Sequence, residues 1–375
     1  MRRYVIFSGA NERAVIAVCR YLSSRGLAPV LIARSAGDPI WRTDYARLVH
    51  VTRQFDHIDV DDLLDCTRQL AVKTADTLVF LPTVESINRV VLAHRLEFEL
   101  AGLSVEMVSQ DVYTTLSDKA SFIKLITEFD MSPPPEIRNP GVEDLPIVAK
   151  PFSEFSKVDR KRCYPELIFS EKEYRSFLKR TRPEDYFYQS YLTGHSFYYL
   201  MHISDEGELV AYQQNLIQQA NGKSMLAARI CNCPSASLER SLLAALKSVS
   251  YRGFVMIEVI QSDGVFYVIE ANPRLWGPFE LACSTPVVKG LTEQLEGKRL
   301  SHSVVSSPVK SCYIWLGGWA SEFMRGHQVR IYPGAVFLLI KEFLRMRCAD
   351  IFFRRDTIKL FLWEIRKAIS SRLTR

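Results

Sequence analysis

The stretch 268-VIEANPRLWG-277 begins like a buried strand and then places three strong polar groups at alternate positions. These groups are a carboxylate, an amide and a guanidinium, on Glu270, Asn272 and Arg274. Successive side chains of a strand alternate between its two faces, so Glu270 and Asn272 share one face. Pro273 ends any regular ladder, because proline has no N–H to donate. The stretch therefore predicts a strand that carries chemistry on one side.

A second strand precedes this stretch, and the turn between the two strands decides what the carboxylates do. Asp263-Gly264 marks the turn of a β-hairpin. With a two-residue turn, Glu258 lies opposite Ile269, and Glu258 and Glu270 then point to opposite faces.

A turn of three residues that begins at Ser262 has the other outcome. Glu258 then lies opposite Val268, and Glu258, Glu270 and Asn272 all share one face. We expect the three-residue turn, because a shared site for these side chains requires a turn of odd length.

Three acceptor groups on a dry sheet face are very costly without a cation. Ligands with only oxygen donors suit Mg²⁺, or Mn²⁺, and Mg²⁺ commonly takes substrate phosphates as further ligands. We therefore predict a metal site at Glu258, Glu270 and Asn272, with Arg274 as a phosphate contact. The alternative is that both glutamates are exposed and that Arg274 pairs with one of them.

The rest of the chain divides into two kinds of structure. The first part is predicted to alternate strands and helices, as strands 4–10, 28–35 and 77–83 and helices 12–26 and about 61–73. This alternation implies a parallel sheet, with ligands beyond the strand ends near Ser8 to Ala10 and Pro82 to Glu85. The opening lacks Gly-x-Gly-x-x-Gly, which argues against a dinucleotide site.

After a helix over 117–129, a connector with five prolines over 131–146 separates this part from a second one. The second part is predicted to contain strands 146–151, 186–192, 196–204, 208–219 and 225–230, a helix over 237–249 capped by Ser237, and the hairpin 254–274. The fold class is therefore α/β first and α+β afterwards.

Composition is that of a globular protein of two or three domains, with 47% apolar and 24% charged residues among 375. The net charge of +6 is concentrated in the tail, where residues 341–375 hold ten Lys and Arg against four Asp and Glu. This local excess argues against a nucleic-acid partner. The eight scattered cysteines, with no signal-peptide core and no membrane-spanning run, predict a cytoplasmic chain with reduced thiols.

The order of several motifs resembles the ATP-grasp superfamily, and in particular its carbamoyl-phosphate-synthase-like carboligases. Glu258 with 270-EANPR-274 resembles the metal-binding hairpin of that superfamily. Asp118-Lys119 resembles the start of its first nucleotide-binding subdomain, and Lys150 resembles its second phosphate-binding lysine. The segment 188-YQSYLTG-194 resembles the hinge that pairs with adenine, and 275-LWGPFELA-282 and 349-ADIFFRRDTIKLF-361 resemble carboligase segments.

The resemblance implies a fold, a set of domains and further site residues. It implies a pre-ATP-grasp parallel-sheet domain over 1–115, a two-lobed ATP-grasp domain over 116–305 and a basic helical C-terminal extension over 306–375. It also implies that ATP contacts Lys119, Lys150, Gln189, Ser190, Tyr191, Leu192 and Ser196, and that Arg274 and Arg229 are catalytic. Without the family, Lys119 and Lys150 read as solvated lysines, Tyr191 and Leu192 as core, and Arg229 as part of a salt bridge.

Two features depart from the family pattern. No glycine stands between Val142 and Thr193, where the family has a flexible loop over the phosphates. In its place, 152-FSEFSKVDRKRCYPE-166 offers donors on Ser153, Ser156, Lys157, Arg160, Lys161 and Arg162. Ser196, beside His195, occupies a position where the family often has an acidic residue for the ribose.

The implied activity is an ATP-dependent ligase that joins a small carboxylate to an amine through an acyl phosphate, in a cleft that Thr83 and Glu85 help to shape. One rival is a nucleotide-binding protein with weak or no turnover. Another is peripheral membrane or partner association through the amphipathic tail segments 336–347 and 357–375. We expect the tail to be a helical cap instead. The sequence does not indicate an oligomeric state.

Overall fold

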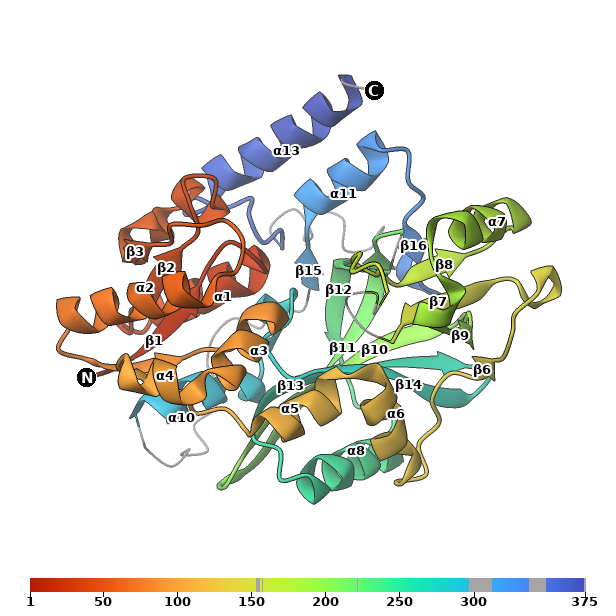
Figure 1. Cartoon of the computed structure of the whole chain (residues 1–375), viewed down its shortest axis with the longest axis horizontal. Coiled ribbons are helices and arrows are strands. Elements are labelled where there is room, and N and C mark those ends of the chain that lie inside the picture. Colours follow the sequence, from red (N-terminus) through yellow and green to blue (C-terminus); the bar gives the residue numbers. More distant parts are fainter. Residues whose placement is uncertain (153–155, 157, 221, 297–311, 337–348, 374–375) are drawn as a thin grey trace.

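Three β-sheets organise the chain (Figure 1). The computed structural model describes residues 1–152, 156, 158–220, 222–296, 312–336 and 349–373. In Figure 1 the parallel sheet lies at the left and the two antiparallel sheets lie at the right, with α11 and α13 along the top. The order α/β and then α+β, predicted from the sequence, is confirmed.

The N-terminal sheet is parallel, with strand order β3-β2-β1-β4-β5. Its strands are β1 (Arg2–Phe7), β2 (Val30–Ala33), β3 (Val49–Thr52), β4 (Thr77–Phe80) and β5 (Leu103–Ser104), and its helices are α1 (Glu12–Ser23), α2 (Val60–Lys73), α3 (Glu85–Ala93) and α4 (Arg95–Leu100). Tyr4 and Ile6 pack into one hydrophobic cluster, and Val5 and Phe7 into another. Both faces of the sheet are therefore covered, as in other parallel sheets.

A small antiparallel sheet of order β6-β9-β7-β8 forms one lobe of the second part. Its elements are β6 (Glu136–Ile137), β7 (Ile147–Pro151), β8 (Glu166–Ile168), α7 (Glu171–Arg180) and β9 (Tyr186–Ser190). The prolines of the connector 131–146 argue against a helix or a central strand, and its residues Glu136 and Ile137 pair with β9 as an edge strand. Proline excludes a central strand, and this short segment lies at the sheet edge, where proline neighbours are tolerated.

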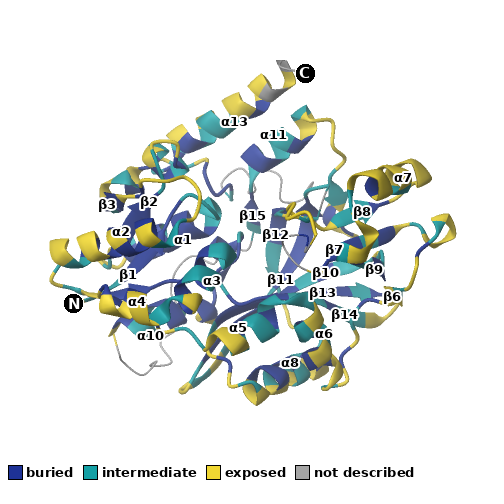
Figure 2. Cartoon of the chain, in the orientation of Figure 1, coloured by how far each residue is buried: buried dark blue, intermediate teal, exposed yellow. Residues whose placement is uncertain are grey.

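A large antiparallel sheet of order β14-β13-β10-β11-β12-β15 forms the other lobe, and β16 pairs with β11. The strands are β10 (His195–Ser204), β11 (Gly207–Gln218), β12 (Met225–Cys231), β13 (Gly253–Ser262), β14 (Val265–Asn272), β15 (Cys312–Ile314) and β16 (Arg330–Ile331). One face packs on α5 (Gln110–Ser117), α6 (Lys119–Thr127) and α8 (Ala236–Ser248). These helices bury one side and expose the other (Figure 2).

The N-cap of α8 differs from the predicted one. Ser235, not Ser237, accepts a hydrogen bond from the Leu238 N–H, at 3.3 Å. Both serines are suitable caps by residue type, so the sequence alone places this helix start only to within two residues.

The C-terminal extension adds strands as well as helices. Its strands β15 and β16 join the large sheet, and its helices are α11 (Leu316–Met324) and α13 (Ile358–Leu373). They follow α9 (Phe279–Ala282) and α10 (Lys289–Glu296). Leu360 and Ala368 of α13 are buried, and Trp315 Nε1 donates to Glu364 at 2.9 Å. This packing agrees with the expectation that the tail forms a helical cap. Most of the tail segment 336–347 lies outside the described residues.

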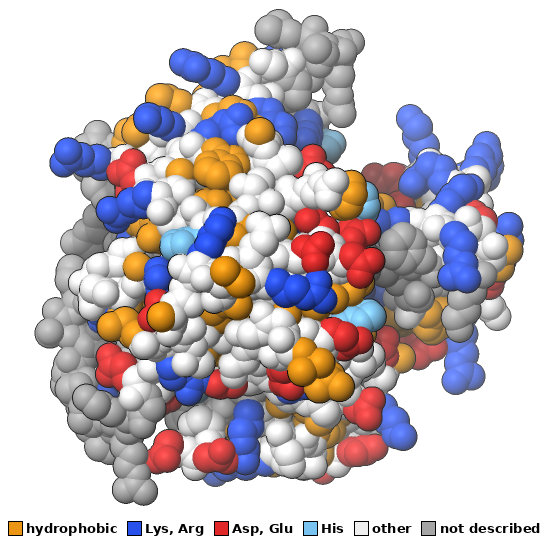
Figure 3. All heavy atoms as spheres, turned by 60° about the vertical axis from the view of Figure 1, so that its left-hand side comes forward, with side chains coloured by type: hydrophobic (Ala, Val, Ile, Leu, Met, Phe, Trp, Pro, Cys, Tyr) orange, Lys and Arg blue, Asp and Glu red, His pale blue; other side chains and the backbone are white. Residues whose placement is uncertain are grey.

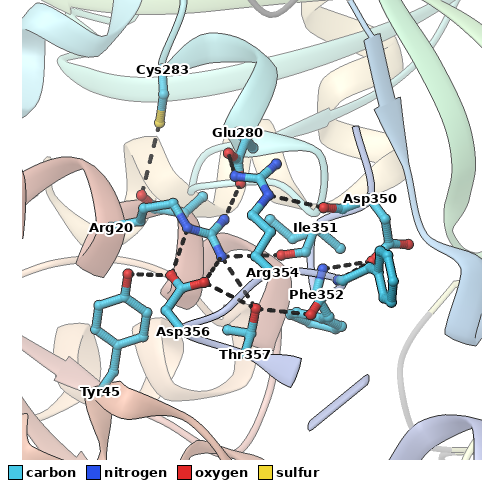
Figure 4. A network of polar contacts seen from close by, with 12 residues as sticks. Arg20, Tyr45, Glu280, Cys283, Asp350, Ile351, Phe352, Arg354, Asp356 and Thr357 are labelled. Carbon is cyan, nitrogen blue, oxygen red and sulfur yellow. Dashed lines mark hydrogen bonds and ion pairs between the residues drawn. The ribbon is translucent and has the colours of Figure 1, made fainter. Parts of the chain in front are cut away.

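A polar network ties this extension to the N-terminal domain (Figure 4). Arg20 of α1 donates to Glu280 at 2.6 Å and to Asp356 at 2.8 Å, and Tyr45 donates to Asp356 at 2.6 Å. Arg354 forms a second ion pair with Glu280. The network holds three distant segments together at one point.

Within the described part of the chain, no helix combines the length and apolar character that crossing a lipid bilayer requires. The cysteines whose placement is described are all free thiols.

Candidate active site

The β13–β14 hairpin brings Glu258 and Glu270 to one face by a route that the sequence did not indicate. Ser262 pairs with Val265, so the turn has two residues, and the prediction of a three-residue turn is wrong. A β-bulge at Ile269 then shifts the register, and Glu258 lies directly opposite Glu270. The extra residue on β14 restores the face that the short turn alone would have reversed.

Glu258, Glu270 and Asn272 consequently line the same cavity. Glu258 is buried, and its burial, followed by the charge of Glu270, raises the pKa of Glu258 to about 8. Asn272 Nδ2 donates to Glu270 Oε1 at 2.9 Å, and Arg274 donates to Asn272 Oδ1 at 2.8 Å. A buried carboxylate and a partly buried one that repel one another, with an amide oxygen beside them, form a donor set that fits Mg²⁺.

Two lysines, Lys150 and Lys119, lie near these carboxylates. Lys150 is 7% exposed, and its Nζ reaches the carbonyl of the bulged Ile269 at 3.4 Å. Burial lowers the pKa of Lys150 to about 8, although Glu270 raises it, and Lys119 lowers it further. Lys119 lies in the first turn of α6, behind the N-cap Asp118, and lines the cavity. An anion between the two ammonium groups would remove their repulsion.

The cavity encloses about 730 Å³ and lies between the N-terminal domain and the large sheet. Thr83 and Glu85, expected to shape a cleft, both line it, as does Arg274. Phe152 and the segment from Arg162 to Pro165 line it from the small sheet. The predicted metal ligands, Lys119 and the cleft residues are thus brought together.

Arg229 is not part of this cavity, and its prediction as a catalytic residue is corrected. Glu258 of β13 lies opposite Tyr198 of β10, and Tyr198 lies opposite Gln213 of β11. The side chains of these three residues therefore share one face of the sheet. Arg229 pairs with the next residue, Gln214, and its Nε donates to the Gln214 side chain at 2.8 Å. Adjacent strand residues face opposite ways, so Arg229 lies on the other side of the sheet.

The predicted hinge lies outside the residues that line the cavity. Gln189 is buried, and its Nε2 donates to the Pro134 carbonyl at 3.3 Å. The Ser190 N–H donates to the Pro135 carbonyl at 2.9 Å, which fixes the strand end. Hydrogen bonds to backbone carbonyls thus fix the hinge in place, and none of its residues lines the cavity.

Arg330 contacts the hinge, a role that no sequence pattern indicated. Its guanidinium donates to the Leu192 carbonyl at 2.6 Å and stacks over Tyr191 and Tyr332, with 4.6 and 4.7 Å to the ring centroids. The strand that carries Arg330 has only two residues, so its sequence gives no periodic signal.

Ser196, predicted to face the ribose, is fully buried and accepts from Asn215 Nδ2 at 2.8 Å. The neighbouring His195 has a buried Nδ1 that finds no hydrogen-bond partner within the described part of the chain. As the chain stands in this structure, Ser196 is closed off from a ligand.

The loop after β7 contributes one of its predicted donors to the cavity. Arg162 lines the cavity, whereas Lys161 points to solvent and pairs with Asp159 at 3.2 Å. The Ser156 N–H donates to the Lys161 carbonyl at 2.8 Å, so this part of the loop folds on itself. Arg160 is exposed, and Ser153 and Lys157 lie outside the described residues.

Sequence reasoning missed the start of α1. Asn11 Nδ2 donates to the carbonyls of Thr83 and Leu275, at 2.9 and 3.1 Å, and so joins the ends of β1 and β4 to the segment after Arg274. Arg13 lines the cavity and donates to Ser224 Oγ at 3.0 Å. The rule that ligands bind beyond parallel strands pointed to this edge, but not to these residues.

Comparison with known proteins identifies the fold. No protein-family model and no curated protein matches the chain in sequence. In structure it resembles N5-carboxyaminoimidazole synthetase from Staphylococcus aureus, with a TM-score of 0.59 and 14% identity over 92% of this chain and 86% of that one. Biotin carboxylase from Campylobacter jejuni has a TM-score of 0.56 and 13% identity over 80% and 72% of the two chains. An L-amino acid ligase from Bacillus licheniformis has a TM-score of 0.52 and 14% identity over 74% and 68%.

Proposed function

The chain has the ATP-grasp fold, and from this premise we propose that it is an ATP-dependent ligase that activates a carboxylate as an acyl phosphate for attack by an amine. One observation carries the proposal: Glu258, Glu270 and Asn272 line a cavity together with Lys119 and Arg274. The structural neighbours named above include a synthetase and an amino acid ligase, which supports the ligase class.

The residues around the cavity have separate roles in this proposal. Glu258, Glu270 and Asn272 would hold Mg²⁺, or Mn²⁺, which supplies positive charge to the phosphates of ATP. Lys119, which lines the cavity, and Lys150, whose Nζ lies 3.4 Å from the Ile269 carbonyl, would neutralise phosphate oxygens. These groups place charge where it develops during phosphoryl transfer, which is the main means of catalysis in this chemistry.

The reaction takes place in two steps. A carboxylate oxygen of the substrate forms a bond to the γ-phosphorus of ATP, the bond to the bridging oxygen breaks, and ADP leaves. The nitrogen of an amine then bonds to the acyl carbon, phosphate leaves, and the amine loses a proton to give the amide. Arg274, at the cavity wall, is our candidate for holding the acyl phosphate.

Nucleotide binding without turnover is the second candidate. Two sequence features favour it: no glycine stands between Val142 and Thr193, where the family has a loop that closes over the phosphates, and Ser196 occupies a position that is often acidic in the family. A chain of this kind would bind nucleotide and release no ADP with any pair of substrates.

The test is a screen of carboxylates with amines, followed by ADP release and by mass spectrometry of the product. The ligase proposal predicts ADP formation and a condensed product with at least one pair, and background ADP with Glu270→Gln. ADP release that is equal in the Glu270→Gln protein would contradict the assignment of the site. Nucleotide binding without a product across the screen would support the second candidate.

A further inference from the structure

A second cavity, of about 420 Å³, lies behind the wall that carries the metal-binding residues. Pro82 and Pro273 line it, whereas their chain neighbours Thr83, Asn272 and Arg274 line the first cavity. The Leu275 N–H donates to the Pro82 carbonyl at 3.1 Å and ties the two wall segments together. The proposed ligase reaction makes no use of this second cavity.

Both acidic and apolar side chains line the second cavity. Its described carboxylates are Glu106, Asp205, Glu206 and Glu293, and its apolar lining includes Phe80, Leu81, Met107, Val108 and Phe254. Arg252, which pairs with Asp205, is the single Lys or Arg among the described lining residues. Glu106 also has partners, since it pairs with Arg2 and accepts from Gln294 at 2.9 Å.

His202 and Glu293 leave buried acceptor atoms in this cavity without a donor. His202 is 8% exposed and Glu293 lies beside it, yet neither His202 Nδ1 nor Glu293 Oε1 has a hydrogen-bond partner among the residues that the structure describes. His202 Nδ1 and Glu293 Oε2 are 3.8 Å apart, which is too long for a hydrogen bond between them. Most buried polar atoms in proteins are satisfied, so this pair needs an explanation.

The packing holds the imidazole in place. The ring centroids of His202 and Phe254 are 4.5 Å apart. A Cβ on Gly290 would clash with His202 Cγ, so only glycine fits there. Burial lowers the pKa of His202 to about 4, and the ring is therefore neutral at pH 7 and has one acceptor nitrogen.

We propose that this second cavity binds a small organic ammonium ion, which donates N–H groups to Glu293 and to His202 Nδ1 and packs its apolar part against Phe254 and Met107. An ammonium group has three donors and no acceptor, so it matches a carboxylate and a neutral imidazole nitrogen. The surplus of carboxylates disfavours an anion. Among the described residues, no group of three His, Cys, Asp or Glu side chains is arranged to hold a metal ion.

Benzylamine is a suitable probe, because it combines an ammonium group with an aromatic ring, and benzyl alcohol is its neutral counterpart. Calorimetric titration of the whole chain should show saturable binding of benzylamine at one site, and binding of benzyl alcohol that is at least about ten-fold weaker. This comparison needs no variant. Absence of saturable benzylamine binding, or equal affinity for the two compounds, would overturn the proposal.

Three variants locate the site. Glu293→Gln keeps the shape of the side chain and removes its charge, and should weaken benzylamine binding about ten-fold or more. Glu99→Gln, an exposed glutamate of α4, and Glu270→Gln, which removes a carboxylate of the first cavity, should leave it unchanged. Equal affinity of the Glu293→Gln and unaltered proteins would contradict the site, as would a comparable loss in Glu270→Gln. Neither result depends on ligase turnover.

Discussion

The folded structure disfavours the ionised form of Glu258. Its pKa of about 8 results from burial and from Glu270, so the folded protein holds a proton that the unfolded chain releases near pH 4.5. A raised pKa contributes stability that is complete below the unfolded pKa and is lost as pH rises through the folded pKa. The pH range that tests this residue therefore runs from about 5 to about 8.

We predict that Glu258→Gln melts at a higher temperature than the unaltered protein at pH 8 in EDTA, and at a similar temperature at pH 5. The expected gain at pH 8 is on the order of 2–4 kcal/mol, because the buried charge is removed. Thermal unfolding across the pH series measures it, with Glu171→Gln, an exposed glutamate of α7, as the control. Parallel pH curves for Glu258→Gln and the unaltered protein would argue against a strained carboxylate.

Lys150 is the opposite case, a buried cation. Among the described residues its hydrogen-bond partner is the Ile269 carbonyl, at 3.4 Å, so a bound phosphate is the partner that we expect for its charge.

We predict that Lys150→Met leaves the ligand-free protein as stable as before, or more stable, and weakens ADP binding by about ten-fold or more. Melting curves and calorimetric titration give the two values. Lys124→Met, an exposed lysine of α6, should change neither. A large loss of stability with unchanged affinity would show that Lys150 is a structural residue.

At the scale of the element, the hairpin shows what a sequence can and cannot indicate. The residue types of Glu258, Glu270 and Asn272 predicted that they meet, because they can bind one divalent cation only if all three side chains share a face. The route was not readable, because Ile269 is an ordinary β-branched strand residue and nothing in its type marks a bulge. Asp263-Gly264 correctly indicated a turn, and the turn has the two residues that this pair usually forms.

This turn gives a prediction of its own. Asp263 and Gly264 both have positive φ, 50° and 80°, as a two-residue hairpin turn requires. Gly264→Ala should destabilise the protein by about 1 kcal/mol, and Asp263→Asn should not, because Asn tolerates positive φ well. A Cβ on Gly264 would meet no atom within 4 Å, so the cost is conformational and not steric. Urea unfolding measures both variants, and equal stability of Gly264→Ala would exclude the strained turn.

At the scale of the whole molecule, contacts between distant segments complete the fold, and these were the least predictable. The strands that hydrophobic periodicity predicted are present in the parallel and antiparallel sheets, but the short strands β3, β5, β8, β15 and β16 were not predicted. Arg20, Glu280 and Asp356 meet across more than 250 residues of sequence, and no local pattern connects them. Arg330 at the hinge and Asn11 at the domain junction escaped prediction for the same reason.

The network of Figure 4 is expected to anchor the C-terminal extension. Glu280→Gln removes the carboxylate that pairs with Arg354 and one of the two carboxylates that pair with Arg20, in a largely buried position, and should cost roughly 3 kcal/mol. Glu171→Gln removes an exposed ion pair and should cost less than about 0.5 kcal/mol. Chemical unfolding compares the two, and equal effects would mean that the network carries no special stability.

The network also predicts how the stability of the protein changes at low pH. Burial alone would raise the pKa of Asp356, but the hydrogen bond and the charge of Arg20 outweigh it and hold the pKa below 3.8. A lowered pKa contributes stability that is present above the unfolded pKa and is lost as pH falls through the folded one. This part of the stability should therefore be lost only below about pH 4.

The surface of the C-terminal extension bears on the hypothesis that this extension contacts a membrane. Figure 3 shows Lys and Arg side chains, with hydrophobic ones between them, at the top of the molecule, where α13 lies in Figure 1. Lys359, Arg366 and Lys367 are exposed along α13, as are Leu362 and Ile369. Peripheral membrane contact stays a hypothesis, and flotation with anionic vesicles, compared with a chain truncated at about residue 340, tests it.

The central claim is that Glu258, Glu270 and Asn272 form one metal site for a nucleotide. Calorimetric titration of ADP at pH 8, with and without Mg²⁺, tests it most directly in the unaltered and Glu270→Gln proteins. We predict that Mg²⁺ strengthens ADP binding about ten-fold or more in the unaltered protein and has almost no effect in Glu270→Gln. Equal enhancement by Mg²⁺ in both proteins, or none in the unaltered protein, would contradict the account.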